Sequence, residues 1–163
     1  NRNSEKLSRL EAVAVELGLP FEEVSLDELG AQADVIISIT SSFAPILKAT
    51  QVKAGTHIAC MGTDTKGKQK IEAALVAKAT VFTDEIAQAI TIGECQHAIA
   101  GGSMTAERIT EIGAVISGKH SGRTSADEIT LFDGTGVGLQ DLSVASDLVK
   151  LAVKSGDALE IEI

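Results

Sequence analysis

The sequence predicts an α/β fold around a mostly parallel sheet, and three observations lead to this prediction. Short apolar runs rich in β-branched residues recur along the chain. Segments whose apolar residues follow helical spacing lie between these runs. Strands that alternate with helices pair in parallel through right-handed crossovers. The 163 residues, 44% of them apolar and 23% charged, suffice for one ordinary domain or a large part of one.

The predicted elements follow one another along the whole chain. Apolar residues at every third or fourth position assign the helices, and short apolar runs bounded by Gly, Ser, Thr or Pro assign the strands. In chain order we expect a helix over residues 4–17, a strand over 21–24, a helical turn over 25–29 that ends at Gly30, strands over 33–39 and 57–61, a helix over 71–79, a strand over 80–83, a helix over 85–99 broken near Gly93, a strand over 128–133 and a helix over 139–154.

Local signals refine the first of these elements. Asn3 or Ser4 fits the N-cap of the first helix, and Gly18 fits its end. Residues 35–37 form a continuous β-branched run, which is typical of a strand covered on both faces. Because the first helix has no strand before it, we expect further sequence upstream of this chain.

Three segments interrupt the alternation of strands and helices. Thr40-Ser41-Ser42 predicts a polar loop after the strand over 33–39. Residues 101–122 are rich in Gly and Ser and predict a surface excursion with one helical piece over 105–112. Residues 158–163 alternate apolar and acidic side chains, which is typical of an edge strand or a tail.

Charge and composition exclude several classes of partner. Fourteen basic against 23 acidic residues give a net charge of −9, which repels nucleic acid and anionic membranes. No apolar run approaches the roughly 18 residues of a membrane span. Cys60 and Cys95 are the only cysteines, too few for a disulfide framework, so we expect a reducing cytoplasm.

Gly134-Thr135-Gly136-Val137-Gly138 lies between a predicted strand and a predicted helix. Its spacing fails the dinucleotide fingerprint because Leu139 stands where a third Gly or Ala is needed. The segment is better interpreted as a Gly-rich turn than as a phosphate loop. Its small residues still allow the backbone to approach a flat ring closely.

A few charged residues are candidates for ligand binding, each with a structural alternative. Asp64 follows a predicted strand at the edge where open parallel sheets place ligands, although Asp in such a loop is also a common turn former. Lys66, Lys68 and Lys70 form a local basic spot that suits a phosphate or carboxylate, or a solvated loop. Arg2 would accommodate a 2′-phosphate if a strand ended before it, and is otherwise a surface residue.

Metal and hydrolase chemistry have no signature in the sequence. His57, His97 and His120 show no ligand spacing, and neither cysteine lies in a C-x-x-C motif. No G-x-S-x-G motif is present. We expect no metal site.

Motifs spread over almost the whole chain share their order and spacing with one known family. They are Ala33-Asp34-Val35-Ile36-Ile37-Ser38-Ile39-Thr40, Gly55-Thr56-His57-Ile58 with Met61-Gly62-Thr63-Asp64 and Gly67-Lys68, Gly93-Glu94, Gly122-Arg123 with residues 128–133, and Gly136 with Leu139-Gln140-Asp141-Leu142. Together they resemble the ornithine cyclodeaminase and mu-crystallin family. The resemblance implies a Rossmann-like sheet, with residues 1–163 as a partial NAD(P)-binding domain and its C-terminal helix. The first strand, the Gly-rich phosphate loop and the N-terminal substrate and dimerisation domain of the family would be absent from this chain.

The resemblance also implies roles for single residues. Asp64 matches the catalytic aspartate, which exchanges a proton with the substrate amine or with water, and Thr135 matches a substrate-binding position. The residues that match cofactor-binding positions are Arg2, Thr40, Ser41, Met61, Lys68 and Gly134. The sequence departs from the family at Lys66, where Pro is frequent, at Lys70, where Glu is frequent, and at Gly134, where Ser is usual. Members with this Gly-rich form look more like imino-acid reductases.

The activity implied by the resemblance is that of an NAD(P)-dependent oxidoreductase on the C–N bond of a small amino or imino acid. A ketimine or iminosuccinate-type reductase fits best, with NAD or NADP as cofactor and a homodimer formed through the missing domain. Three alternatives remain open. They are an ornithine cyclodeaminase that yields proline and ammonia with bound NAD, a non-catalytic mu-crystallin-like cofactor-binding protein, and an inactive fragment.

Overall fold

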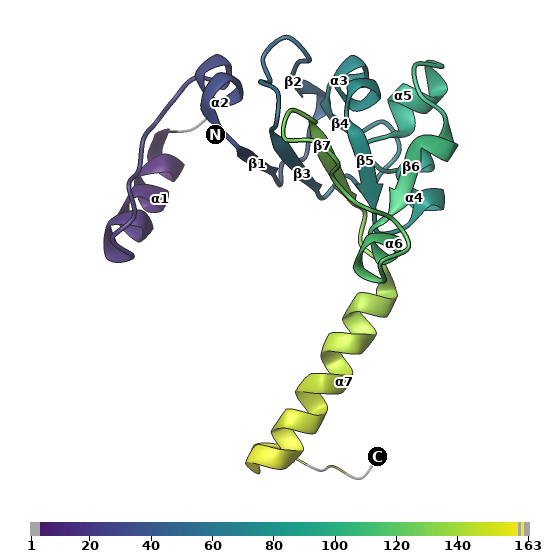
Figure 1. Cartoon of the computed structure of the whole chain (residues 1–163). Helices are drawn as coiled ribbons and strands as arrows, with labels where there is room; N and C mark the ends of the chain where they lie inside the picture. Colours follow the sequence, from purple (N-terminus) through teal and green to yellow (C-terminus); the bar gives the residue numbers. More distant parts are fainter. Residues whose placement is uncertain (1–3, 160, 162–163) are drawn as a thin grey trace.

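The computed structural model describes residues 4–159 and residue 161, and its architecture is α/β with a central parallel sheet (Figure 1). The helices are α1 (Ser4–Glu16), α2 (Leu26–Gln32), α3 (Ala73–Lys78), α4 (Ile86–Thr91), α5 (Gln96–Ala100), α6 (Ile112–Ile116) and α7 (Gly138–Ser155), with a short 3₁₀ turn at Ala106–Arg108. The strands are β1 (Val35–Ser38), β2 (Phe43–Leu47), β3 (His57–Met61), β4 (Gln69–Ile71), β5 (Thr80–Thr83), β6 (Ile109–Glu111) and β7 (Thr130–Gly134).

The main sheet contains five parallel strands in the order β1-β3-β7-β5-β6. β7 is the last strand in the chain, and it lies in the middle of the sheet between β3 and β5. β2 and β4 form a separate parallel pair. Because all five strands of the main sheet run the same way, the loops that follow them meet at one edge, which we call the carboxyl edge.

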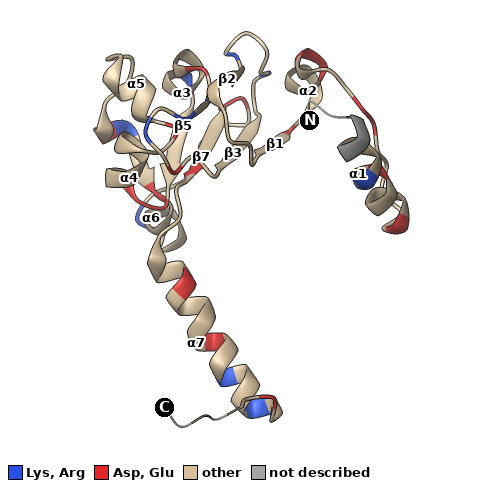
Figure 2. Ribbon diagram, turned by 180° about the vertical axis from the view of Figure 1, so that it is seen from behind, with Lys and Arg blue, Asp and Glu red and all other residues tan. Residues whose placement is uncertain are grey.

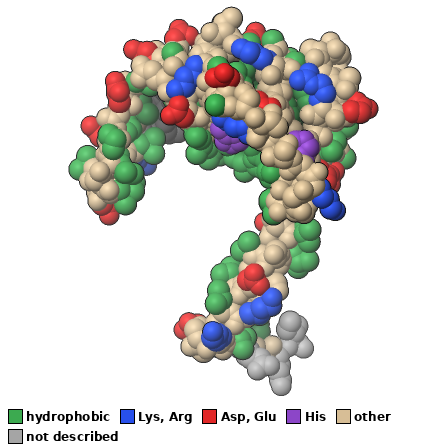
Figure 3. All heavy atoms as spheres, viewed as in Figure 1, with side chains coloured by type: hydrophobic (Ala, Val, Ile, Leu, Met, Phe, Trp, Pro, Cys, Tyr) green, Lys and Arg blue, Asp and Glu red, His purple; other side chains and the backbone are tan. Residues whose placement is uncertain are grey.

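One face of the main sheet is buried, and the opposite face is open at β1. Ile36, Ile58 and Leu131 belong to the core, together with residues of α3, α4 and α5. On the opposite face of β1, Val35 and Ile37 are 58% and 66% exposed. Figure 3 shows hydrophobic side chains gathered on the underside of the sheet. Residues 35–37 therefore alternate between the two faces, and the expectation of a strand covered on both faces is wrong for this chain.

Helix α2 begins at a capping box. The Ser25 side chain accepts a hydrogen bond from the Glu28 backbone N–H, and the Glu28 carboxylate accepts one from the Ser25 backbone N–H. The expected single turn is therefore extended to Gln32. Gly30 does not end the helix but lies buried within it.

Most predicted elements, the strands over 57–61 and 80–83 among them, recur at or near their expected bounds. Residues 21–24 form no strand, because no neighbouring strand lies beside them in the described part of the chain. β2 was not predicted, and Ile71 belongs to β4, not to a helix over 71–79. β6 lies within the expected surface excursion and forms an edge of the main sheet.

Helices α1 and α7 project away from the sheet, and α7 extends furthest (Figure 1). Acidic and basic residues lie along α7 (Figure 2), whereas Leu142, Leu148 and Val149 are exposed apolar residues of the same helix. No helix in the described part of the chain is long and apolar enough to cross a membrane. Residues 158, 159 and 161 form no strand, and the remaining tail residues lie outside the described residues.

Candidate functional site

The predicted site residues gather at the carboxyl edge, although they come from distant parts of the sequence. They are Thr40 and Ser41 after β1, Met61 at the end of β3 with Asp64 and Lys68 in the loop beyond it, and Gly134 and Thr135 at the end of β7. Met61 and Gly134 are partners in the β3–β7 ladder. A Cβ atom on Gly134 would lie 2.5 Å from Met61 Sδ, so these two residues pack in direct contact. Arg2 lies outside the described residues.

Asp64 and Lys68 form an ion pair at this edge. Lys68 Nζ lies 2.6 Å from Asp64 Oδ1, and Thr65 Oγ1 donates to the same oxygen at 3.1 Å. The Asp64 side chain is 56% exposed, whereas that of Lys68 is 15% exposed. The pKa of Asp64 is lowered, mainly by the hydrogen bond from Lys68 and further by the hydrogen bond from Thr65. Asp64 is therefore a carboxylate at neutral pH and is open to solvent.

The loop that carries Asp64 and Lys68 is anchored from below by α5 and the residues before it. Gln96 Oε1 accepts from the Gly67 N–H at 2.7 Å, and Gln96 Nε2 donates to the Lys68 carbonyl at 3.2 Å. Buried Glu94 accepts from Thr63 Oγ1 at 2.8 Å. Neither Gln96 nor Glu94 was predicted as a site residue. Gly93-Glu94 was noted only as a motif, and nothing local indicates that Gln96 contacts a loop 29 residues earlier.

Asp84 fixes the neighbouring loop after β7 and was also missed. It accepts from the Thr135 N–H at 3.0 Å, the Thr135 hydroxyl at 2.6 Å and the Gly136 N–H at 2.7 Å. Burial alone would raise the pKa of Asp84, but these three hydrogen bonds together outweigh burial and lower it. The only sequence signal was an acidic residue directly after the strand over 80–83.

Asp133 lies beneath the edge and is fully buried. Its Oδ2 accepts from the backbone N–H groups of Glu94 at 2.8 Å and Cys95 at 3.3 Å, whereas Oδ1 has no partner among the described residues. Burial raises the pKa of Asp133 to about 7 despite these hydrogen bonds. Burial likewise raises the pKa of the Cys60 and Cys95 thiols, so neither is a ready nucleophile.

The predicted basic spot separates into three different environments. Lys66 is exposed and Lys68 is paired with Asp64. Lys70 is buried, and its ammonium group donates to the Met61 carbonyl. Of the three lysines, only Lys66 lies in a solvated loop, which was the structural alternative for this basic spot. The buried side chain of Lys70 cannot contact a ligand.

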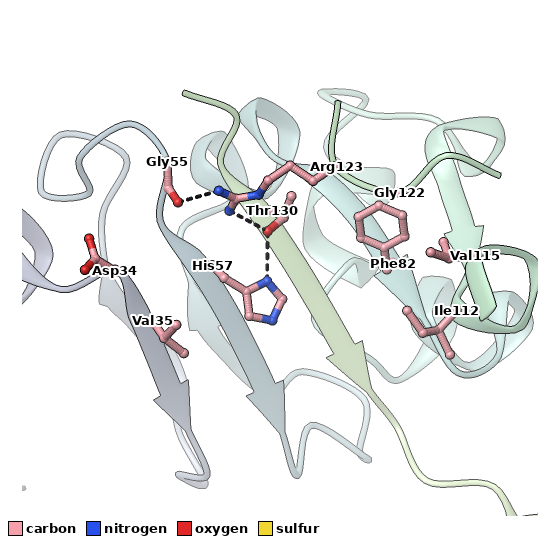
Figure 4. A pocket seen from close by; sticks show the side chains of 10 residues that line it. All are labelled: Asp34, Val35, Gly55, His57, Phe82, Ile112, Val115, Gly122, Arg123 and Thr130. Atoms are coloured by element: carbon pink, nitrogen blue, oxygen red, sulfur yellow. Dashed lines mark hydrogen bonds between the residues drawn. The ribbon is translucent and has the colours of Figure 1, made fainter. Parts of the chain in front are cut away.

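A hollow of about 500 Å³ lies at the opposite ends of the strands and holds none of the predicted site residues (Figure 4). Arg123 enters its rim and donates to the Gly55 carbonyl at 2.8 Å and to Thr130 Oγ1 at 3.1 Å. The ring of His57 is hydrogen-bonded to the same hydroxyl at 2.8 Å. Burial, followed by the charge of Arg123, lowers the pKa of His57. No group of three His, Cys, Asp or Glu side chains in the described ranges could hold a metal ion.

The carboxyl edge combines small residues with exposed polar groups. Gly62 and Gly136 leave open space where a side chain would otherwise lie. A hollow of about 810 Å³ adjoins the end of β1 and is lined by Thr40, Ser41 and the start of β2. The exposed carboxylate of Asp64 and the hydroxyls of Thr40 and Ser41 offer hydrogen-bonding groups at this edge.

Comparison with known proteins adds sequence evidence to this geometry. The profile of the ornithine cyclodeaminase/mu-crystallin family matches residues 6–156. An iminosuccinate reductase of Paracoccus denitrificans (strain Pd 1222) is 61% identical over 163 residues, which cover 100% of this chain and 51% of the relative. An alanine dehydrogenase of Archaeoglobus fulgidus is 36% identical over 144 residues, or 88% of this chain and 43% of that protein.

Solved structures agree with the sequence matches. The crystal structure of the iminosuccinate reductase of Paracoccus denitrificans in complex with NAD+ superposes with a TM-score of 0.94 at 60% identity, over 99% of this chain and 50% of that chain. An archaeal alanine dehydrogenase dimer with bound NAD gives a TM-score of 0.90 at 32% identity, over 96% and 49% of the two chains. This chain spans about half the length of the relatives that it matches.

Proposed function

The chain belongs to the ornithine cyclodeaminase/mu-crystallin family, and from that premise we propose that the full-length protein is an NAD(P)-dependent oxidoreductase acting on the C–N bond of a small amino or imino acid. Within this class we propose an iminosuccinate-type reductase. The observation that carries the proposal is 61% identity to an iminosuccinate reductase over the whole chain. The alanine dehydrogenase and pyrroline-2-carboxylate reductases among its relatives act on the same kind of bond.

The residues that would hold the nicotinamide end line the carboxyl edge. Thr40 and Ser41 would flank the nicotinamide on one side, and Met61 and Gly134 would face its ring. The ion pair with Asp64 would keep the Lys68 ammonium group within reach of the cofactor. When bound, a reduced nicotinamide supplies a hydride to the carbon of the imine. Arg2 would accommodate the 2′-phosphate of NADP, so we expect NADPH to be accepted.

Asp64 would act on the nitrogen of the substrate. A protonated imine is positively charged, and the ionised carboxylate of Asp64 can pair with it and hold its proton on nitrogen while the carbon is reduced. Lys68 restrains the carboxylate at 2.6 Å and so limits the directions in which it points. Thr135 donates its hydroxyl proton to Asp84, which leaves the hydroxyl oxygen free to accept a hydrogen bond from the amine product.

The full-length protein is also proposed to be a homodimer that works in the cytoplasm. A relative of known structure, an archaeal alanine dehydrogenase with bound NAD, is a dimer, which supports the proposed assembly. Two free, buried cysteines in the chain support a reducing compartment. Size-exclusion chromatography with light scattering of the full-length protein measures the assembly directly.

Steady-state oxidation of NADH and NADPH by the full-length protein tests the proposed activity. Oxaloacetate with ammonia, pyruvate with ammonia, and a cyclic ketimine serve as substrates, and each carbonyl compound without ammonia is the control. We expect oxidation that requires ammonia and is fastest with oxaloacetate. Proline and ammonia formed from ornithine without net coenzyme oxidation would instead indicate a cyclodeaminase. Coenzyme binding with no turnover of any substrate would indicate a binding protein.

A further inference from the structure

Lys70 is a buried lysine whose ammonium group joins the ends of two strands. Its side chain is 1% exposed. Nζ lies 2.6 Å from the carbonyl oxygen of Met61, the last residue of β3, and 3.4 Å from that of Ser38, the last residue of β1. Glu94 Oε2 lies 3.9 Å away on another side. Lys70 therefore contacts both strands at the carboxyl edge.

Glu94 completes this buried arrangement. Its Oε1 accepts from the backbone N–H groups of Lys70 and Ile71 at 2.7 and 2.6 Å, and its Oε2 accepts from Thr63 Oγ1. Thr63 directly precedes Asp64 in the loop after β3. Glu94 thus holds the start of that loop through the side chain of Thr63, and Lys70 holds it through the carbonyl of Met61.

Burial of such a pair is weak evidence for stability. Removing two charges from water has a large free-energy cost, and apolar residues of similar volume often replace a buried ion pair with no loss of stability. Lys70 donates to the carbonyls of Ser38 and Met61. The loop with Thr40 and Ser41 begins after the first carbonyl, and the loop with Asp64 begins after the second. The geometric effect of these hydrogen bonds is to fix the separation of the two loops.

We propose that Lys70 is a positioning residue for the dinucleotide, which sets the gap between the loop after β1 and the loop after β3. The proposal rests on the proposed function, because it takes the nicotinamide end to lie between these loops. Lys70 acts only through the backbone of Ser38 and Met61 and contacts neither cofactor nor substrate.

The test measures the Kd of NADH and of NADPH for the full-length protein by coenzyme fluorescence. Lys70→Met keeps the length of the side chain and removes the ammonium group. We expect it to raise the Kd of the preferred coenzyme by about tenfold, because hydrogen bonds to a charged group are lost on both loops. With saturating coenzyme, kcat should stay within about threefold of the unchanged protein.

Lys53→Met is the matched control. Lys53 Nζ also joins a backbone carbonyl, that of Gln32 at 2.7 Å, to a carboxylate, that of Asp34 at 2.7 Å. Both partners precede β1, at the end of the strand opposite to the carboxyl edge. We expect its coenzyme Kd to be unchanged. A loss of folded protein alone would lower the apparent kcat of either variant and leave Kd unchanged.

Lys70→Met leaves the charge of Glu94 buried without its partner, and this variant could therefore fail to fold. A double variant keeps the test decisive in that case. Lys70→Met with Glu94→Gln removes both charges, and we expect it to fold and to show the same weakened coenzyme binding. Coenzyme binding by Lys70→Met or by the double variant that equals that of the unchanged protein would overturn the proposal, as would a double variant that cannot fold. If the unchanged protein binds neither coenzyme, the proposed function itself fails, and this inference fails with it.

Discussion

At the scale of single residues, two carboxyl groups of the carboxyl edge have environments that move their pKa values apart. Asp64 faces solvent and accepts hydrogen bonds from Lys68 and Thr65, so its pKa is lowered. Asp133 is buried with one oxygen unpartnered among the described residues, and its pKa is raised to about 7. Carboxyl groups with opposite shifts take different roles in a site. Asp64 is a charged group open to solvent, and Asp133 is an interior acid.

Asp64→Asn is expected to reduce kcat by a factor on the order of 10²–10⁴, the usual contribution of a proton-handling group. The coenzyme Kd should change by less than about threefold, because the amide keeps the volume of the side chain. Asp34→Asn is the control, since Asp34 is also an exposed aspartate paired with a lysine, at 2.7 Å. Equal losses of kcat in both variants, or a matching loss of coenzyme binding in Asp64→Asn, would show that Asp64 only caps its loop.

Asp133 gives the stability of the fold a definite pH dependence. Its pKa of about 7 in the folded protein lies above its ordinary value of roughly 4, so the folded state binds more protons between these two pH values. The free energy of unfolding therefore falls as pH rises through this window and levels off above about 7.

Asp133→Asn removes this titration. Between pH 5 and 8, we expect the unchanged full-length protein to lose on the order of 2 kcal/mol more stability than Asp133→Asn. Urea unfolding at the two pH values measures the difference. Parallel changes in the two proteins would mean that Asp133 is ionised in the folded state across this range.

The residues at the carboxyl edge differ in how far the sequence could predict them. Asp64 and Lys68 lie in one short motif after a strong strand signal, so their proximity could be predicted locally. Asp84 and Thr135 are 51 positions apart, and Glu94 and Asp133 are 39 positions apart. These contacts arise because β7 enters the middle of the sheet, and no local pattern specifies that position.

At the scale of elements, strands with a strong intrinsic signal were predicted and strands created by pairing were not. β3 and β5 have the bounds that their apolar runs predicted. β4 and β6 are each three residues long, and their extended backbone depends on partners in β2 and β5. Short segments of this kind carry little periodicity of their own, so tertiary contacts decide their conformation.

Two helical glycines provide a prediction at this scale. A Cβ atom on Gly30 of α2 would lie 2.4 Å from the backbone carbonyl oxygen of Gln51, which cannot rotate away. Gly113 of α6 has open space in the same position. Gly30→Ala should lower the free energy of unfolding by about 1–3 kcal/mol because α2 must move off the chain at Gln51. Gly113→Ala should leave it unchanged or raise it by up to about 1 kcal/mol.

Thermal and urea unfolding of the two full-length variants measures this contrast. The same change of helical residue type is made in both, so helix propensity is matched. A Gly30→Ala variant as stable as Gly113→Ala would show that α2 does not pack against Gln51 as closely as the structure places it.

At the scale of the whole molecule, parallel topology explains how one site forms from residues between Thr40 and Thr135. Strands β1, β3, β5 and β7 all end at the same edge, and each contributes its last residue or the loop beyond it. Buried polar groups under the edge, Glu94, Asp133 and Lys70, then fix these loops relative to one another.

The measurement that tests the central claim most directly is transfer of deuterium from reduced coenzyme to product. The full-length protein is supplied with NADH or NADPH that carries two deuterium atoms at C4 of the nicotinamide, together with oxaloacetate and ammonia, and the amino acid formed is analysed by mass spectrometry. The account predicts one deuterium on the carbon that bears the nitrogen, for every coenzyme oxidised. An amino acid without deuterium, or oxidation of coenzyme that forms no amino acid, would contradict it.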